Sequence, residues 1–291
     1  MNKIVSDLRR TLLPLTPAFA LVAVQLVFFG LPAGAFIRGV VLGLLTALLA
    51  VGMALVYRAN RVINFAQADL GFVPAILSVG LIVFNGLPYL FGLGVGLISS
   101  IVLGAIVELA IVRRFVRSPR LVLTVATLGI TQLLTVLAIL LPRLWDEVAA
   151  SERIPPPVAW KLTVGTFILN ANDLIAMILA PLAMIAVGLF LSKTQVGIAV
   201  RAAAERSDRA ALLGIPVGWL STIVWMLASA LSFLALFLRS GILGVPIGGA
   251  LSVSGLVLAL AALVIGRLRN LPTIAVAAVA LGILEYGVQW N

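Results

Sequence analysis

Long apolar runs separated by short polar connections make up most of the chain. Each run approaches or exceeds the roughly 20 residues that a helix needs to cross a bilayer. The runs are continuously apolar and lack the two-residue alternation of barrel strands. This pattern predicts an all-α, polytopic integral membrane protein with about nine transmembrane helices. They occupy residues 15–33, 39–57, 69–84, 88–112, 121–141, 174–191, 217–238, 248–266 and 271–290.

Three of these runs depart from a simple span. The run at 69–84 is short and contains Pro74, and the run at 248–266 opens in a glycine-rich stretch, so either is a candidate for a broken or re-entrant helix. The first run precedes Ala33-Gly34-Ala35, which has the pattern of a signal-peptide cleavage site. It is longer than the roughly 7–15 apolar residues of a signal-peptide core, so we keep it as a span.

The basic residues predict the orientation of the spans. With a cytoplasmic N-terminus and alternating spans, 15 of the 20 Lys and Arg residues fall in inner connections. An excess of Lys and Arg in cytoplasmic loops is the usual signal of orientation. The count therefore supports both the alternation and an inner N-terminus.

Composition excludes several classes of function. With 63% hydrophobic and 10% charged residues, the chain is far more apolar than a soluble domain, so we expect a multi-pass membrane protein in contact with lipid. The net charge of +10 does not indicate a nucleic-acid partner, because the basic residues form short clusters between apolar runs. Cys and His are both absent, which removes the usual ligands of a metal site.

The inner connection at 192–216 predicts a short amphipathic helix. Residues 197–213 are rich in Ala, Arg, Glu and Leu, which favour helix. Gly214 stands where a helix C-terminus favours positive φ, and Pro216 prevents continuation. Such a helix could lie on the membrane surface. Because its apolar stripe is mostly alanine, we favour docking to another protein.

Polar side chains also gather around the third run. Asn60 and Asn64 are four residues apart, Gln67 follows three residues later and Asp69 two residues after that, where the chain enters the membrane. Asp69 could cap the start of a helix or line a path for a polar solute, and the two roles are compatible. On the fifth run Thr127 and Thr131 could bond either a solute or a neighbouring helix.

Two carboxylates and one long loop complete the polar inventory. Glu108 lies within two turns of Arg113 and Arg114, close enough to the end of its run to reach the membrane interface beside them, whereas Glu285 sits deeper in its run. Without His or Lys inside the runs, the chain has no evident proton relay.

The outer loop at 142–173 contains three consecutive prolines, Pro155 to Pro157, and is either a solvated spacer or a docking surface for an external partner.

Three segments resemble the LivH-type permeases of ATP-binding-cassette importers for branched-chain amino acids. The first is GLLTALLAVGMALVYR at 43–58 with RVINFAQADLG at 61–71, the second is RSPRLVLTVATL at 117–128, and the third is GIAVRAAAERSDRAALLGIP at 197–216. The resemblance extends in order from about Arg38 to Gln289. Two positions depart from the family: Gln67 replaces a histidine, and arginines 267 and 269 replace glycines in a turn.

The resemblance implies roles for residues that match its motifs. In a bacterial-type inner membrane, loop 192–216 would carry a coupling helix at 197–215 that contacts a cytoplasmic ATPase, and Asn64, Gln67 and Asp69 would lie near the translocation path. Asn60, Thr127 and Thr131 are further candidates for this path or its gate because of their own polar side chains. The resemblance also implies a second, LivM-like permease (or a fused second half), ATPase subunits and an extracytoplasmic binding protein. The expected coupling residues are Gly197, Arg201, Ala202, Glu205, Ala210, Leu213, Gly214 and Ile215.

We therefore expect residues 1–291 to form one permease domain, lacking the family's last span, with no catalytic chemistry of its own. It has no GxxxxGK[ST] motif, so ATP would be bound by the partner subunits and this chain would need no cofactor. The alternatives are a permease for urea, short amides or another small polar solute, and a self-sufficient secondary transporter. A membrane-embedded enzyme is a third alternative, for which only the Asn60–Asp69 group offers polar residues.

Overall fold

The computed structural model describes residues 16–28, 30–116, 118–145, 153–165, 167–205, 207–245, 250–268 and 270–290. Each predicted apolar run contains one helix. In chain order these are α2 (Thr16–Phe28), α3 (Ala33–Asn60), α4 (Gln67–Val83), α5 (Tyr89–Ala110), α6 (Arg120–Leu140), α7 (Ala171–Lys193), α10 (Val217–Leu243), α11 (Ala250–Ile265) and α12 (Leu271–Trp290).

Shorter elements connect these helices. The 3-10 turns η2 (Val112–Phe115) and η3 (Leu141–Trp145) follow α5 and α6, and the helices α8 (Gln195–Glu205) and α9 (Ser207–Leu212) lie between α7 and α10. Strands β1 (Lys161–Val164) and β2 (Phe167–Asn170) pair antiparallel, with Lys161 opposite Asn170. The hairpin was not predicted from the sequence. It turns at Gly165, whose φ of 62° favours glycine.

The helices confirm the class of a multi-pass, all-α membrane protein. By length and composition, α3, α5, α6, α7, α10 and α12 can each cross a membrane, whereas α2, α4 and α11 are shorter apolar helices. The total of nine spans and the cytoplasmic N-terminus stay predictions. The glycine-rich start predicted for the eighth span falls partly on residues 246–249, outside the described residues.

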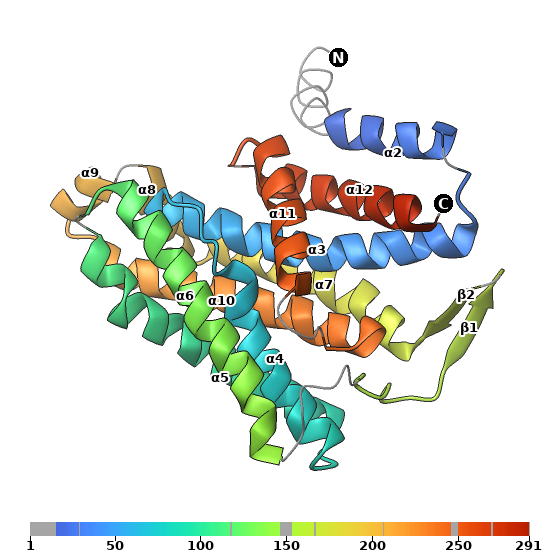
Figure 1. The fold of residues 1–291 in the computed structure, drawn as a ribbon. Helices are drawn as coiled ribbons and strands as arrows, with labels where there is room; N and C mark the ends of the chain where they lie inside the picture. Colours follow the sequence, from blue (N-terminus) through green and yellow to red (C-terminus); the bar gives the residue numbers. More distant parts are fainter. Residues whose placement is uncertain are drawn as a thin grey trace.

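Helices α3 and α10 form the centre of the bundle (Figure 1). Helix α3 packs against α12, α10, α11 and α7, while α10 also packs against α4 and α5. Two crossings are close enough to require glycine. A Cβ at Gly43 of α3 would lie 2.7 Å from the Cα of Val279 in α12, and a Cβ at Gly71 of α4 would overlap the backbone of Ser232 in α10. These contacts fix the central helices at close range.

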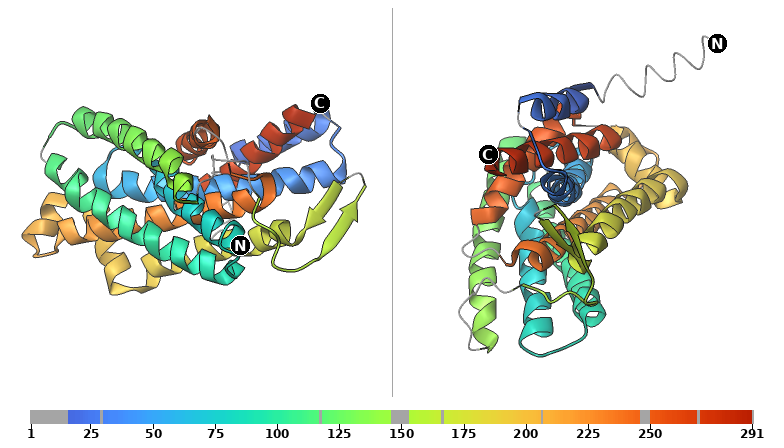
Figure 2. Two further views of the ribbon diagram at one scale, coloured as in Figure 1. Left: turned by 60° about the horizontal axis from the view of Figure 1, so that its bottom comes forward. Right: turned by 90° about the vertical axis from the view of Figure 1, so that its right-hand side faces the viewer.

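The two ends of the bundle carry different structures. The β1–β2 hairpin projects from one end, and α8 and α9 lie at the opposite end (Figures 1 and 2). We call these the hairpin end and the α8–α9 end. Since segments 142–173 and 192–216 were predicted to lie on opposite sides of the membrane, their separation agrees with that prediction.

Candidate functional site

Helix α4 begins inside the bundle. Helix α3 ends at Arg61, whose backbone adopts a left-handed conformation with φ of 56° and whose N–H donates to Tyr57 O at 2.8 Å. Residues 61–66 then return into the bundle, and a Cβ at Gly52 of α3 would overlap the Gln67 amide. Gly52 lies eight residues before Asn60, which is about 12 Å along the helix. Gln67, which contacts Gly52, therefore lies about 12 Å inside the end of α3. Helix α4 is continuous through Pro74, so the structure shows no break at this proline, and a re-entrant third span stays a prediction.

A buried polar network surrounds the start of α4. The Gln67 Nε2 group donates to Ser232 Oγ at 2.6 Å and to Ala228 O at 3.0 Å, both on α10. Asn64 Nδ2 donates to Gln67 Oε1 at 3.2 Å. Asn64 and Gln67 are both fully buried. Amide side chains in a membrane bundle need such partners because no water replaces them, so the network joins α4 firmly to α10.

The other predicted path residues are Thr127, Thr131, Asp69 and Asn60, and they differ in how they contact this network. Thr127 Oγ1 of α6 accepts from Phe65 N at 3.2 Å, which brings α6 to the same segment. Thr131, one turn further, has a buried Oγ1 without a hydrogen-bond partner among the described residues. Asp69 is buried in the first turn of α4. Asn60 bonds separately, donating to Ser221 Oγ at 3.2 Å.

The sequence analysis missed the partners on α10. Ser229 Oγ donates to Leu70 O at 3.3 Å, and Ser232 accepts from Gln67. These serines are three residues apart within an apolar run, a spacing that places them on one helix face. This spacing could have identified the two serines as candidate partners for the polar residues of α4.

A cavity of about 680 Å³ lies between this network and the α8–α9 end. Leu123 and Val224 line it one turn before Thr127 and Ala228 respectively, so the polar network lies just beyond its inner wall. The remaining lining comes from the ends of α3, α5 and α10, the start of α6 and the inward face of α8. Helices α6 and α10 thus contribute both to the network and to the walls of the cavity.

Glu108 forms a buried charge cluster at the edge of this cavity. Its Oε2 accepts from Thr222 Oγ1 at 2.7 Å and from Arg113 Nη2 at 3.2 Å. Arg113 Nη2 also lies within hydrogen-bond distance of Gly218 O, at 3.1 Å, and thereby links α5 to the start of α10. The sequence analysis placed Glu108 near Arg113 without predicting this contact, and it did not foresee Thr222, which lies more than 100 residues away.

The predicted coupling segment forms two helices rather than one. Thr194 caps α8, since its Oγ1 accepts from Gly197 N at 2.9 Å. A Cβ at Gly197 would lie 2.6 Å from the Cα of Leu191, so this glycine allows α8 to pack against the end of α7. The close packing explains Gly197 without any external partner.

The C-terminus of α9 has the geometry predicted for it. Gly214 has a φ of 80°, its N–H donates to Ala211 O at 3.0 Å, and Ile215 N–H donates to Ala210 O at 3.0 Å. This pair of bonds is a Schellman motif, which satisfies the last carbonyls of a helix. Leu212 and Leu213 are left 87% and 81% exposed at the tip.

The alanine stripe does not provide the docking surface that the sequence analysis favoured. Ala203, Ala204 and Ala210 are buried against the chain's own core. The stripe packs inward because small side chains allow α8 to approach α3 and α10 closely. The face left open has a different composition and includes Arg201, Ala202, Glu205, Arg209, Leu212 and Leu213.

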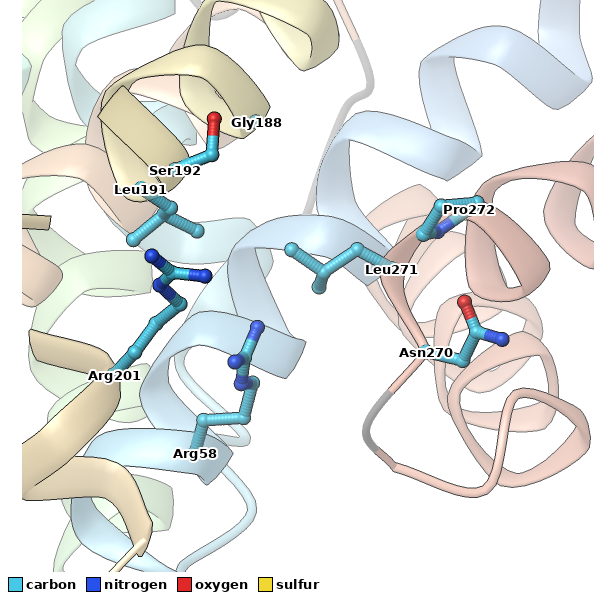
Figure 3. Close-up of a pocket in the computed structure, with 8 residues that line it drawn as sticks. All are labelled: Arg58, Gly188, Leu191, Ser192, Arg201, Asn270, Leu271 and Pro272. Atoms are coloured by element: carbon cyan, nitrogen blue, oxygen red, sulfur yellow. The ribbon is translucent and has the colours of Figure 1, made fainter. Parts of the chain in front are cut away.

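Arg201 lines a second cavity, of about 390 Å³, on the other side of α8 (Figure 3). The guanidinium groups of Arg201 and Arg58 both point into this open space, which is also lined by Leu191 of α7 and by Leu271 and Pro272 of α12. The Arg201 guanidinium lies beside Leu191, across the space from the start of α12 (Figure 3).

One side chain joins the α8–α9 segment to the polar network. Arg61 Nη2 donates to Ala204 O at 2.6 Å, at the C-terminal end of α8. A cation at a helix C-terminus is favoured by the helix dipole. Because Arg61 begins the segment that leads to Asn64 and Gln67, this bond connects α8 to the start of α4.

The predicted outer loop is anchored to the bundle at the hairpin end. Asn172 Nδ2 donates to Ile154 O at 3.0 Å and to Gly241 O at 2.8 Å. Arg38 forms an ion pair with the buried Asp173 and so ties the start of α3 to the start of α7. Ile154 is itself buried, so the described part of this loop is more than a solvated spacer.

Apolar spans around a buried polar network, with a cavity beneath it and paired helices at one end, make this a multi-pass membrane protein with a polar interior. Comparison with known families identifies which kind. Residues 35–290 match the family described as "Branched-chain amino acid transport system / permease component". The chain belongs to this family.

Two curated proteins are similar over most of the chain. The probable branched-chain amino acid transport permease protein LivH of Methanocaldococcus jannaschii is 28% identical, over 83% of this chain and 76% of that protein. The high-affinity branched-chain amino acid transport system permease protein BraD of Pseudomonas aeruginosa is 24% identical, over 86% of this chain and 83% of that protein. No solved structure matches the chain.

Proposed function

We propose that this chain is the membrane-spanning subunit of an ATP-driven importer for branched-chain amino acids, with the α8–α9 end in the cytoplasm. The observation that carries the proposal is the exposed tip of α9 together with the bond from Arg61 to α8. Family membership and the names of both relatives supply the substrate class. The distribution of Lys and Arg supports the orientation.

The proposed partners follow from the two ends of the bundle. ATPase subunits would bind the tip at Leu212 and Leu213, because exposed apolar side chains beyond the membrane favour a protein contact. A solute-binding protein would deliver the amino acid at the hairpin end. A LivM-like permease would complete the path, and ATP would be bound only by the ATPase subunits.

The coupling step would pass through Arg61. Movement of α8 by the ATPase would pull on the Ala204–Arg61 bond, and Arg61 begins the segment that positions Asn64 and Gln67. Displacing that segment would separate Gln67 from Ser232 and open the buried network toward the cavity. Asn64, Gln67 and Thr127 are thus proposed as the gate, with Asp69 and Thr131 beside it.

Reconstitution tests this function directly. The chain is combined in liposomes with its ATPase, second permease and binding protein, and uptake of labelled leucine is measured with and without ATP. Glu205→Lys and Gly214→Val change the exposed face and the Schellman turn, so ATP hydrolysis should continue while uptake falls at least tenfold. Arg267→Glu, an exposed charge reversal in the α11–α12 turn, is the matched control and should leave uptake unchanged.

Three results would overturn the proposal. Normal uptake by both coupling variants would remove α8–α9 from the coupling step. Uptake by the chain alone, without ATP, would indicate a secondary transporter. Competition by urea or acetamide, with no effect of leucine, valine or isoleucine, would assign another solute.

A further inference from the structure

The 680 Å³ cavity at the α8–α9 end has the size of a small-molecule site. Ligand pockets commonly fall between about 300 and 1,000 Å³. It lies beneath the gate network, on the side from which an imported solute would leave. Its lining combines three kinds of groups, which together indicate what the cavity binds.

The first kind is a pair of buried oxygen atoms without donors. Glu108 Oε1 and Asn60 Oδ1 have no hydrogen-bond partner among the described residues, although both residues line the cavity. The Glu108 side chain is fully buried, and its other oxygen already accepts from Thr222 and Arg113. Buried acceptors left unpaired are costly, and a positively charged donor would satisfy both.

The second kind is a pair of cations without acidic partners. Arg61 and Arg113 are engaged with Ala204 O and Glu108, but Arg114 and Arg120 form no ion pair within the part of the chain that the structure describes. Both are exposed and line the cavity. Arg120 is the first residue of α6, where free backbone N–H groups also favour an anion.

The third kind is an aliphatic wall. Leu123 of α6, Val200 of α8 and Val224 of α10 line the cavity and are buried. A branched aliphatic group placed against them would be removed from water on several sides. None of the three can hydrogen-bond through its side chain, so this wall favours an apolar ligand group.

From these groups we propose that the cavity is the inward-facing binding site for the amino-acid zwitterion. Glu108 and Asn60 bind the ammonium group, Arg114 and Arg120 bind the carboxylate, and the aliphatic wall binds the side chain. This inference rests on the proposed function, because it assigns the site from which the imported amino acid is released. A simple anion would meet the carboxylate of Glu108, and a simple cation would meet the free arginines, whereas a zwitterion has an opposite charge for each.

The test uses the complete transporter in liposomes with ATP inside, so that only molecules with their ATPase side inward are active. Binding protein and labelled leucine are added outside, and unlabelled compounds are loaded inside. Internal leucine should inhibit initial uptake by occupying the site. The probes 3-methylbutylamine, which lacks the carboxylate, and 4-methylpentanoate, which lacks the ammonium group, should each require at least tenfold higher internal concentration.

Variants of the lining residues identify the site. Glu108→Gln and the double variant Arg114→Gln/Arg120→Gln should each raise the inhibitory concentration of internal leucine at least tenfold, while Arg267→Gln should not change it. Because Glu108 is buried, thermal unfolding checks that its variant folds. The double variant changes only exposed side chains and tests the site independently.

The outcomes separate this inference from the proposed function. If the wild-type transporter takes up no leucine with ATP, the proposed function fails. If uptake is normal but internal leucine does not inhibit, or both variants behave as Arg267→Gln does, the zwitterion site is wrong. Equal inhibition by leucine and 4-methylpentanoate would instead indicate a simple anion site and would also overturn the inference.

Discussion

Helices α3 and α10 differ from α6 and α7 in position but hardly in hydropathy. The best membrane windows of α3 and α10 have mean hydropathies of 2.5 and 2.0, and those of α6 and α7 have 2.1 and 2.7. Yet 89% and 78% of the residues in the first pair are buried inside the chain, against 28% and 22% in the second. Apolar content therefore places a helix in the membrane without deciding which neighbours it has.

Small and polar residues make the difference between these pairs. In the central helices they lie at contacts, as Gly52 does against Gln67 and Ser232 does against the same amide. On α6, Gly129 has nothing within 4 Å of its Cβ position, and Leu121 and Leu133 are exposed. The outer faces of α6 and α7 are thus available to lipid or to a second permease.

The largest effect is expected at the closest central crossing. Gly71→Leu places a side chain into the backbone of Ser232, and overpacking that neither backbone can relieve should cost about 3 kcal/mol or more. The matched change Gly129→Leu on α6 enters open space. Thermal unfolding in detergent should show a large loss of stability only for Gly71→Leu. Equal losses in the two variants would remove the distinction between central and outer helices.

The second test breaks the buried network without adding volume. Gln67→Leu leaves Asn64 Nδ2 and Ser232 without the Gln67 amide and should cost about 2 kcal/mol or more, since each unpaired buried group costs roughly 1–3 kcal/mol. Gln132→Leu on α6 makes the same change at an exposed position. Unfolding midpoints and leucine uptake should both fall for Gln67→Leu and hold for Gln132→Leu. A stable, fully active Gln67→Leu protein would show that the network neither supports the bundle nor gates the path.

The same contrast explains what could be predicted from the sequence. Helical runs and the Gly214 turn depend on residues close in the chain, because every backbone group in lipid must be satisfied locally. Glu108 and Arg113 are only five positions apart, so the sequence placed them near each other although it did not specify their contact. Thr222, Ser232 and the bond from Arg61 to Ala204 join segments more than 100 residues apart, and one sequence does not reveal such pairs.

The alanine stripe shows why a correctly predicted helix can be assigned the wrong docking face. Its small side chains suit close contact with any protein, and the pattern does not tell an external partner from the chain's own core. Ala203 and Ala210 are buried against this chain. The β1–β2 hairpin was missed for a different reason: two four-residue strands beside a glycine turn give a weak pattern in so apolar a sequence.

A third prediction concerns the link between the α8–α9 segment and the central helices. Arg61→Gln removes the charge from the bond to Ala204 O, and charge-assisted bonds contribute roughly 1.5–3 kcal/mol. We expect leucine uptake to fall about tenfold in the reconstituted transporter while ATP hydrolysis continues. Arg61→Lys keeps the charge and should recover part of the uptake. If Arg61→Gln lowers hydrolysis and uptake together, Arg61 acts on assembly with the ATPase rather than on transmission.

The smallest effect is expected where an outer helix depends on its own cap. Asn170 begins α7 with a capping box: its side chain accepts from Asp173 N at 3.2 Å, and its N–H donates to Asp173 Oδ2 at 2.9 Å. Asn170→Ala should cost about 1 kcal/mol, which corresponds to a fall of roughly 2–4 °C in the unfolding midpoint. Asn170→Ser keeps a capping oxygen and should restore most of it. Helix α7 is mostly exposed, with 22% of its membrane window buried, so its cap should contribute little to the stability of the whole bundle. A loss of stability as large as that of Gly71→Leu would mean that the hairpin end, rather than the glycine crossings, limits the stability of the bundle.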